Sequence, residues 1–390
     1  MSRVLPLLLP STSSFVRKGF FMARISTLES LKTQLQNRYG ERSAMLASEI
    51  PPYRTFSTGS LALDYATGVG GLPTNRVVEF AGAPGVGKTT ITLHAVNNCL
   101  KLFPDRFCLY IDAEHRLTPD WVKAFVEDWE RVIVVAPDHV EQATDMYTDA
   151  VSTGECAIAV FDSIGGTPSQ RVTGKSAEIG NIGGNALAIT RFSQFAQIMS
   201  GKYETCTIGI NQIREDMSGY HRLMTPGGKS WQHAASLRVE LKRGQGKVFE
   251  KVDGDDLQVG FSVVAKVHKN SLSAPGRSTY FWFYNLESKY GFGIDFLDEI
   301  TRLAMLADVI ENPARGTYTY PEFPDGKIRG KDNVILFVKE HPETQEALKE
   351  KVLAKLKGHE IQGVAQSFDI DNAAGSDFDE SGFLKRLNEG

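Results

Sequence analysis

Seven short apolar runs between residue 55 and about residue 295 constrain the fold of this chain more than any other feature of the sequence. Several are apolar almost throughout, including "RVVEFAG", "FCLYIDAE", "CAIAVFDS" and "CTIGINQ", as in strands that are buried on both faces of a parallel sheet. Stretches with helical spacing separate the earlier runs, for example "KTTITLHAVNNCLKL" and "NALAITRFSQFAQIMS". This alternation predicts βαβ units and an α/β fold with a mostly parallel central sheet flanked by helices.

The pattern changes toward the C-terminus. The last two apolar runs, "SLRVELKR" and "FSVVAKVHKN", follow each other without clear helices between them, so we expect them to extend the sheet in antiparallel fashion. We therefore predict a core domain over residues 55–295. Residues 296–358 show helix, two short strands and helix, which predicts a small C-terminal α/β domain. Residues 359–390 carry seven acidic and two basic residues, which predicts an acidic, disordered tail that is either simply solvating or limits access of a polyanion.

The N-terminal part of the sequence has two segments. Residues 1–21 contain Arg, Lys and Ser but no acidic residue, as in a transit peptide or weak signal sequence, but we favour an upstream start codon, with Met22 opening the natural chain. Residues 22–54 are predicted to form a helix and a linker. The helix would carry apolar residues near one face, at Ile25, Leu28, Leu31, Leu35 and Tyr39. A lone amphipathic helix has to bury that face, either in its own domain or on a neighbouring subunit.

Composition narrows the classes of protein. The sequence is 42% hydrophobic and 23% charged, with a net charge of -4, as in ordinary globular proteins. No run approaches the roughly 18 apolar residues that a transmembrane helix needs. The four cysteines form no CxxC pair, so we expect neither a zinc site nor disulfides, but reduced thiols in a cytoplasmic protein.

The stretch "GAPGVGKTT" directly follows the apolar run "VVEFA" and matches the phosphate-binding pattern GxxxxGK[ST]. Glycines let backbone N–H groups surround phosphate oxygens, and the following helix directs its positive end at the anion. The pattern predicts a nucleotide site with Lys88 on the β- and γ-phosphates; the alternative is a glycine-rich turn without a ligand. The predicted nucleotide-binding residues of this loop are Gly82, Ala83, Pro84, Gly85, Val86, Gly87, Lys88, Thr89 and Thr90.

Carboxylates follow two other predicted strands. Asp162 ends "CAIAVFD", where it is either a helix N-cap or, together with the Thr89 hydroxyl, a site for Mg²⁺. Asp112 and Glu114 end "FCLYIDAE". We assign Glu114 to orienting the water that attacks the γ-phosphate, and Asp112 to binding backbone or loop groups.

Two other side chains follow these carboxylates. We expect His115 to be a packed, hydrogen-bonded residue rather than a catalyst. Trp121 has two open interpretations, since it would either stack on an adenine or pack in the core.

Taken in order, these motifs resemble those of the RecA recombinase family, over roughly residues 25–356. The entry to the phosphate loop, "FSTGSLALDYATGVGGLPTNRVVEFAG", carries the resemblance most fully. "YIDAEH" is similar to the segment with the family's catalytic glutamate, which falls on Glu114, and "INQIR" to the strand whose glutamine senses the γ-phosphate, which falls on Gln212. "KVHKNSLSAP" resembles a strand that offers lysines to the ATP of the adjacent subunit, here Lys269. "KYGFGI" implies an adenine-side role for Tyr290.

The resemblance also implies two DNA-binding loops. They correspond to "GGTPSQRVTGKSAEIGNIGG" after Asp162 and to "EDMSGYHRLMTPGGKSW" after "INQIR". The loops contain acids as well as cations, so the composition by itself does not establish DNA binding. The predicted DNA-contacting cations of the loops and the helix between them are Arg171, Lys175, Arg191, Arg214, Arg222 and Lys229.

Four departures from the family pattern affect these expectations. Ser271 replaces the second lysine that would act across subunits, and Thr118 stands where an adenine-contacting aspartate is expected. Trp121 replaces a tyrosine, and Gln232 and His233 replace a basic and an aromatic residue. We interpret this drift as typical of a phage-encoded relative.

The resemblance implies an ATP- and Mg²⁺-dependent recombinase that exchanges DNA strands. Such a protein forms helical filaments of its own copies on single-stranded DNA, pairs them with double-stranded DNA, and works with single-strand-binding and mediator proteins. Two other functions remain open: a hexameric helicase of the same superfamily, which would need a larger N-terminal domain, and a regulatory ATP-binding paralogue with little turnover. The presence of Glu114 favours turnover.

Overall fold

The structure is a computed structural model that describes residues 27–50, 53–170, 182–213, 225–252, 255–288 and 291–358. It divides into two units, with the boundary between Tyr53 and Arg54. Arg171, Lys175, Arg214, Arg222, Tyr290 and the acidic tail lie outside the described residues.

The N-terminal unit contains the predicted amphipathic helix, over residues 27–39, followed by two short 3₁₀ turns, η1 (Glu41–Ser43) and η2 (Ala47–Glu49). Lys32 joins the helix to the second turn, because its Nζ lies 2.6 Å from Glu29 and 2.7 Å from Glu49. Among the described residues of this unit, the apolar side chains of the helix stay largely exposed. The exposed apolar residues of the unit are Leu28, Leu31, Leu35, Tyr39, Met45, Ile50 and Tyr53.

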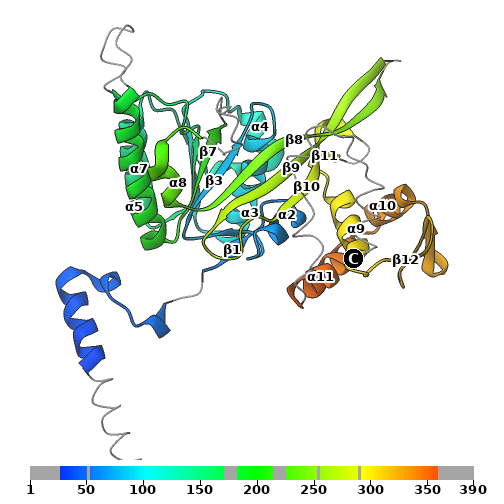
Figure 1. The fold of residues 1–390 in the computed structure, drawn as a ribbon, viewed down its shortest axis with the longest axis horizontal. Helices are drawn as coiled ribbons and strands as arrows, with labels where there is room; N and C mark the ends of the chain where they lie inside the picture. Colours follow the sequence, from blue (N-terminus) through cyan, green and yellow to red (C-terminus); the bar gives the residue numbers. More distant parts are fainter. Residues whose placement is uncertain are drawn as a thin grey trace, which may run out of the picture. The chain divides into compact units, whose positions relative to one another are not determined.

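A nine-stranded sheet forms the centre of the second unit, in the order β11-β10-β9-β8-β3-β7-β6-β4-β5 (Figure 1). Strands β8, β3, β7, β6, β4 and β5 are parallel, and β9, β10 and β11 add to β8 in antiparallel fashion, as predicted. The strand bounds are β3 (Val77–Gly82), β4 (Phe107–Asp112), β5 (Val132–Val135), β6 (Cys156–Asp162), β7 (Cys206–Gln212), β8 (Ala235–Val252), β9 (Asp255–Asn270), β10 (Ser278–Ser288) and β11 (Gly291–Ile294). A separate two-stranded sheet pairs β1 (Thr55–Phe56) with β2 (Leu72–Pro73).

Helices cover both faces of the sheet, and the central strands β3, β4, β6 and β7 are buried along almost their whole length. Helices α3 (Lys88–Leu102) and α4 (Pro119–Phe125) contribute to one core, in which Phe80 and Val160 are buried. Helices α5 (Val140–Ser152), α7 (Ile182–Tyr203) and α8 (Gly228–Ala234) pack on the other face around Trp231 (Figure 1). All four cysteine thiols are buried and free.

The C-terminal region has one strand and one helix more than the sequence pattern predicts. Its three strands form a separate sheet, and its three helices pack with α2 (Leu61–Ala66) of the core around a third apolar cluster. The prediction of two strands and two helices was therefore wrong, because strands of three or four residues are too short to show an alternating pattern. The elements are α9 (Phe296–Leu306), β12 (Glu311–Ala314), β13 (Thr317–Thr319), η4 (Pro324–Gly326), β14 (Lys327–Arg329), α10 (Lys331–Glu340) and α11 (Pro342–Gly358).

Glu299 anchors this region to the core. The side chain is almost fully buried, and its two oxygens accept hydrogen bonds from Ser60 Oγ and from the N–H of Leu61, each at 2.6 Å. Both partners lie at the start of α2, so the Glu299 carboxyl group caps that helix. In the part of the chain that the structure describes, no helix is both long enough and apolar enough to cross a lipid bilayer.

Candidate active site

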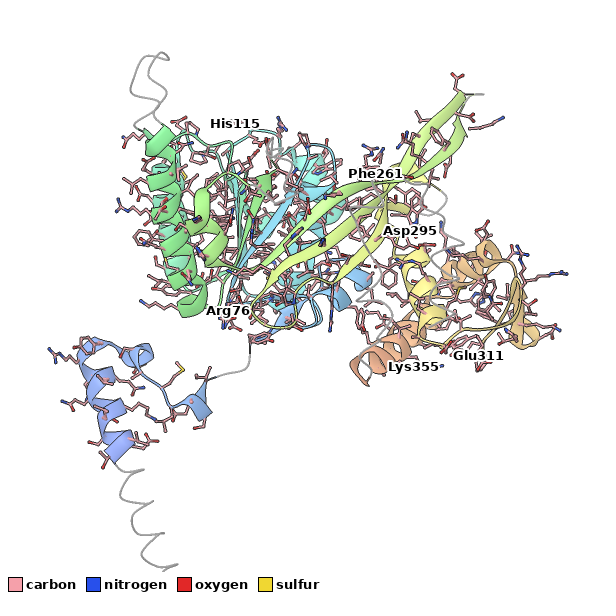
Figure 2. All side chains as sticks on the ribbon, viewed as in Figure 1. Arg76, His115, Phe261, Asp295, Glu311 and Lys355 are labelled. Carbon is pink, nitrogen blue, oxygen red and sulfur yellow. The ribbon has the colours of Figure 1, made fainter. Side chains whose placement is uncertain are left out.

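The carboxyl ends of the parallel strands form one edge of the sheet, where α/β proteins bind ligands. Arg76, which precedes β3, and His115, which follows β4, lie at opposite ends of these strands in Figure 2. A cleft of about 530 Å³ opens at the edge marked by His115. Its lining residues are Pro84, Gly85, Gly87, Lys88, Thr89, Thr90, Tyr110, Asp112, Glu114, Arg116, Leu117, Thr118, Trp121, Phe125, Asp162, Ser163, Ile210, Gln212, Phe261, Phe283, Tyr284, Asn285 and Phe292.

The predicted phosphate loop connects β3 to α3 along one wall of this cleft. Gly85 and Gly87 have φ angles of 73° and 93°, in a region that side chains with a Cβ disfavour. A Cβ on Gly87 would also lie 2.3 Å from Phe283 Cε2, so no other residue fits there without displacing the ring. Of the nine predicted loop residues, six line the cleft. Gly82 and Val86 are buried, and Ala83 is exposed outside the lining.

Lys88 is the first residue of α3, and its side chain turns back over the loop. Its Nζ donates to the carbonyl oxygens of Gly82 at 2.9 Å and Ala83 at 2.8 Å. Burial lowers the pKa of Lys88, and the nearby carboxylates of Asp162 and Glu114 oppose that shift. The ammonium is therefore held at the cleft, with its position set by the loop backbone.

Thr89 and Asp162 meet in the cleft, as the motif predicts. Thr89 Oγ1 donates to Asp162 Oδ2 at 3.0 Å, and Tyr110 OH donates to the same oxygen at 2.9 Å. Burial raises the pKa of Asp162, while the hydrogen bonds from Tyr110 and Thr89 act in the opposite direction. A hydroxyl and a carboxylate at this spacing offer the oxygen ligands that Mg²⁺ prefers.

Glu114 lies beside Gln212 at the ends of two different strands. Glu114 Oε1 accepts hydrogen bonds from Ser163 Oγ at 2.6 Å and from Gln212 Nε2 at 3.2 Å. Its other oxygen lies 2.9 Å from the guanidinium of Arg116, which is largely exposed. The structure thus brings together the two residues predicted to handle the γ-phosphate, from positions 98 residues apart.

For the two neighbours of Glu114, Asp112 and His115, the structure agrees with one prediction and contradicts the other. Asp112 is buried and accepts the backbone N–H of Leu117 at 2.9 Å, which confirms its role in holding the loop. The prediction for His115 was wrong. The residue is exposed and has a left-handed φ of 54°, because the chain turns sharply after β4 and directs this side chain away from the core.

Three aromatic side chains in the lining of the cleft pack on one another. Trp121 is 38% exposed and makes edge contacts with Phe125 at 5.4 Å and Phe292 at 6.0 Å between ring centroids. Trp121 therefore packs on core aromatic rings and also lines the cleft, and its stacking on an adenine stays a prediction. Thr118 is the N-cap of α4, where its Oγ1 accepts the N–H of Trp121 at 3.3 Å.

Lys269 does not line the cleft of its own subunit. It extends from β9 to the C-terminal end of α8, where its Nζ donates to the carbonyl oxygens of Gln232 and His233, each at 2.9 Å. Burial and the nearby Arg238 lower the pKa of Lys269, and Glu79 opposes them. Ser271, in the place of the second expected lysine, donates its backbone N–H to Ser236.

Two of the predicted DNA-contacting cations are described by the structure, and both are exposed. Arg191 lies on α7, with its guanidinium 5.8 Å from the ring of Phe195, and Lys229 lies in the first turn of α8. Each belongs to a helix next to one of the segments 171–181 and 214–224.

Three contacts in the cleft were missed by sequence reasoning. They are the hydrogen bond of Tyr110 to Asp162, that of Ser163 to Glu114, and the ion pair of Arg116 with Glu114. Tyr110 carried a usable signal, because it lies two residues before Asp112 and so projects from the same face of β4.

The sequence was compared with protein families and with known proteins. The family model of the RecA N-terminal domain matches residues 26–295. The chain is 32% identical to the protein RecA of Acinetobacter baylyi over 342 residues, which is 84% of this chain and 92% of that protein. It is 30% identical to the protein RecA of Phytoplasma mali, over 85% of this chain and 96% of that protein. It is 31% identical to the protein RecA of Paracoccus denitrificans, over 84% of this chain and 89% of that protein. With a family match over most of its length and relatives covered almost end to end, the chain belongs to the RecA family.

Proposed function

We propose that this chain is a recombinase that polymerises on single-stranded DNA and hydrolyses ATP at the junctions between its subunits. RecA-family proteins are DNA-dependent ATPases with a function in recombination and repair, and the chain shares that activity. The observation that carries the proposal is the meeting of Glu114 and Gln212 in the same cleft as Lys88 and the Thr89–Asp162 pair.

The phosphate loop is the binding site for the triphosphate of ATP. Its backbone N–H groups and the N-terminus of α3 attract the phosphates, and Lys88 exchanges its bonds to Gly82 and Ala83 for phosphate oxygens. Trp121, Phe125 and Phe292 supply an apolar aromatic surface for the base. Tyr290 is proposed to contact the adenine as well.

Thr89 and Asp162 are the residues that would hold Mg²⁺, Thr89 directly and Asp162 through water. The bound ion would neutralise charge on the β- and γ-phosphates. In the described parts of the chain, no cluster of three or more His, Cys, Asp or Glu side chains is arranged to bind a metal. A site of this kind suits Mg²⁺, which keeps several waters and is bound by one or two protein ligands together with the phosphates.

Glu114 is proposed to orient the attacking water. The water oxygen forms a bond to the γ-phosphorus as the bond to the β,γ-bridging oxygen of ADP breaks, and a proton leaves the water. Ser163 and Gln212 both donate to Glu114 Oε1, so the carboxylate is held in place. Among the described residues, its Oε2 pairs with the exposed Arg116. That oxygen is available to accept the proton or to direct the water.

Gln212 is proposed to report the γ-phosphate to the DNA-binding segments. It is the last residue of β7 and lies directly before the second predicted loop. A γ-phosphate would compete with Glu114 for its amide, and the resulting shift would be passed to that segment. Arg191 and Lys229, with the predicted Arg171, Lys175, Arg214 and Arg222, would then contact DNA phosphates without reading sequence.

Polymerisation is proposed to use the N-terminal unit, whose apolar residues are exposed in the part of it that the structure describes. The edge of the core sheet is the proposed receiving surface. Strand β5 is an edge of the sheet, and its Ile133 and Val134 side chains are 49% and 47% exposed. Docking of residues 22–54 of one copy on this edge of the next would repeat indefinitely and give a helical filament.

Lys269 is proposed to act on the ATP of the adjacent subunit. Its distance from its own cleft and its position at the end of α8 are consistent with that role. When a γ-phosphate is presented by a neighbour, the ammonium would leave the carbonyls of α8 and neutralise the charge that develops during phosphoryl transfer.

The deciding experiment measures ATP hydrolysis with and without single-stranded DNA, together with electron microscopy in the presence of a non-hydrolysable ATP analogue. We expect turnover that DNA stimulates and helical filaments that need both ligands. Closed rings would indicate a helicase instead. Binding of ATP with neither turnover nor filaments would indicate a regulatory paralogue. Single-strand-binding and mediator proteins are proposed as further partners that load such filaments.

A further inference from the structure

A buried polar network connects β3, β7 and β8 next to the cleft but outside its lining. Glu79 of β3 is fully buried, and its Oε1 accepts a hydrogen bond from Asn211 Nδ2 at 2.9 Å. Its Oε2 pairs with Arg238 Nε of β8. Arg238 in turn donates through Nη2 to Thr225 Oγ1 at 3.2 Å. The network thus runs from the middle of the sheet to the first residues after segment 214–224.

Stability alone is a weak explanation for this network. Burying a carboxylate and a guanidinium removes both from water, and replacing such a pair with apolar residues is often neutral or stabilising. Strand β3 is buried along its whole length, with Val77, Val78 and Phe80 beside Glu79. We therefore infer that the Glu79–Arg238 pair serves to orient the groups to which it bonds.

Asn211 is the group that the pair orients. Its Nδ2 donates both to Glu79 and to the carbonyl oxygen of Pro226, the latter at 2.8 Å. Its Oδ1 accepts the backbone N–H of Gln212 at 3.1 Å. A carboxylate and a carbonyl only accept hydrogen bonds, and a backbone N–H only donates. The amide of Asn211 can therefore satisfy all three partners in a single orientation.

The segment that follows β6 reaches the same point. Ile164 donates its backbone N–H to the carbonyl oxygen of Ile210, at 3.0 Å. A Cβ built on Gly165 would lie 2.7 Å from Pro226 Cβ and 2.9 Å from Asn211 Oδ1. The beginning of the first predicted DNA loop and the end of the second therefore meet at Asn211, directly beside the residue that contacts Glu114.

We propose that Asn211, held in one orientation by the Glu79–Arg238 pair, is a positioning residue that couples Gln212 to the ends of both DNA-binding segments. A movement of Gln212 changes the position of its backbone N–H, and Asn211 passes this displacement to Pro226 and Gly165. DNA bound to these segments would act on Gln212 in turn, because coupling between two binding sites is reciprocal. The inference rests on the proposed function, since it concerns the DNA dependence of ATP hydrolysis.

The test compares two variants of the full-length protein with a matched control. Asn211→Asp keeps the shape of the side chain but removes both of its N–H donors. In Gly165→Ala the new methyl group would push Asn211 and Pro226 apart, while the substitution removes no polar group. The control is Thr207→Val, at the opposite end of β7, where the buried Thr207 hydroxyl bonds to Tyr147 OH and Ser200 Oγ, each at 2.8 Å.

The measurement is the ratio of ATPase kcat with single-stranded DNA to kcat without it, together with KM for ATP and the melting temperature. We expect the ratio to fall about tenfold in Asn211→Asp and in Gly165→Ala, as the loss of a typical coupling free energy predicts. KM for ATP should change less than about threefold, since neither residue lines the cleft. Thr207→Val should melt at a lower temperature yet keep the wild-type ratio.

Three outcomes separate the inference from its alternatives. If Asn211→Asp and Gly165→Ala keep the wild-type ratio, whatever their melting temperatures, Asn211 is merely structural and the inference fails. If Asn211→Asp does not fold, Gly165→Ala decides alone, because it leaves the buried pair intact. If the wild-type protein itself shows no stimulation by DNA, the proposed function fails instead.

Discussion

Replacing Glu114 with Gln should separate catalysis from stability. The new side chain is isosteric, and its carbonyl oxygen can still accept from Ser163 and Gln212 as Glu114 Oε1 does at 2.6 and 3.2 Å. What disappears is the negative charge and the contact with Arg116 at 2.9 Å. Because the Arg116 side chain is 77% exposed, that ion pair is worth about 0–1 kcal/mol.

The expected effect on turnover is far larger. A residue that accepts a proton or orients a water in the transition state contributes about 10²- to 10⁴-fold to the rate. At about 1.4 kcal/mol per factor of ten, this loss corresponds to about 3–5 kcal/mol of activation free energy. The variant should therefore lose DNA-stimulated ATP hydrolysis while it keeps its folding stability and its ability to bind ATP.

The assay combines steady-state ATP hydrolysis on single-stranded DNA with thermal unfolding and with filament formation in the presence of ATP. We expect filaments that persist, because the bound triphosphate is no longer consumed. Turnover within a few fold of wild type would remove Glu114 from the water-orienting role. An equal loss of ATP binding and turnover would show that the carboxylate acts in binding instead.

Three further predictions follow from the cleft and the interfaces. Lys88→Ala should weaken ATP binding at least tenfold, because the loss of one charge-assisted hydrogen bond costs about that much. Calorimetry with the non-hydrolysable analogue measures the affinity. An unchanged affinity would contradict the contact of Lys88 with the phosphates. Lys269→Ala should lower DNA-stimulated kcat at least about 100-fold but leave the ATP affinity of dilute monomers unchanged. Equal losses of kcat and of ATP affinity would refute the proposal that Lys269 acts on the ATP of the adjacent subunit. Burial raises the pKa of Glu299 to about 7, so the folded state holds its proton more tightly than the unfolded state does. As the pH rises from about 5.5 to 8, the wild-type protein should therefore lose about 1–3 kcal/mol of folding stability relative to Glu299→Gln. If the difference in melting temperature between the two proteins stays constant over this pH range, the carboxyl is not both buried and protonated.

Much of the active site could be predicted because its residues follow strands. The meetings of Thr89 with Asp162 and of Glu114 with Gln212 depend on one rule, that parallel strands end at a common edge of the sheet. Each of these residues lies at or just after the end of a strand, or at the start of the helix after it. The apolar runs that predict the strands therefore also predict where the active-site residues lie.

The coupling network could not be predicted in this way. Glu79 stands in the run "VVEFA" like any isolated polar residue, and its partners Asn211 and Arg238 lie 132 and 159 residues away. No spacing or composition within one segment indicates such a pair. The exposed turn at His115 and the role of Thr118 as a helix cap were missed for a similar reason, because φ angles and caps depend on how the chain leaves one strand to reach the next helix.

Local patterns in the sequence thus suffice for the α/β class, the phosphate loop, the antiparallel extension and the family, because each depends on neighbours within about 20 residues or on a strand's own hydrophobicity. Which strand lies beside which depends on packing over the whole sheet, where β3 sits between β7 and β8. That arrangement alone brings Glu79, Asn211 and Arg238 together, and it therefore decides which buried charges are paired.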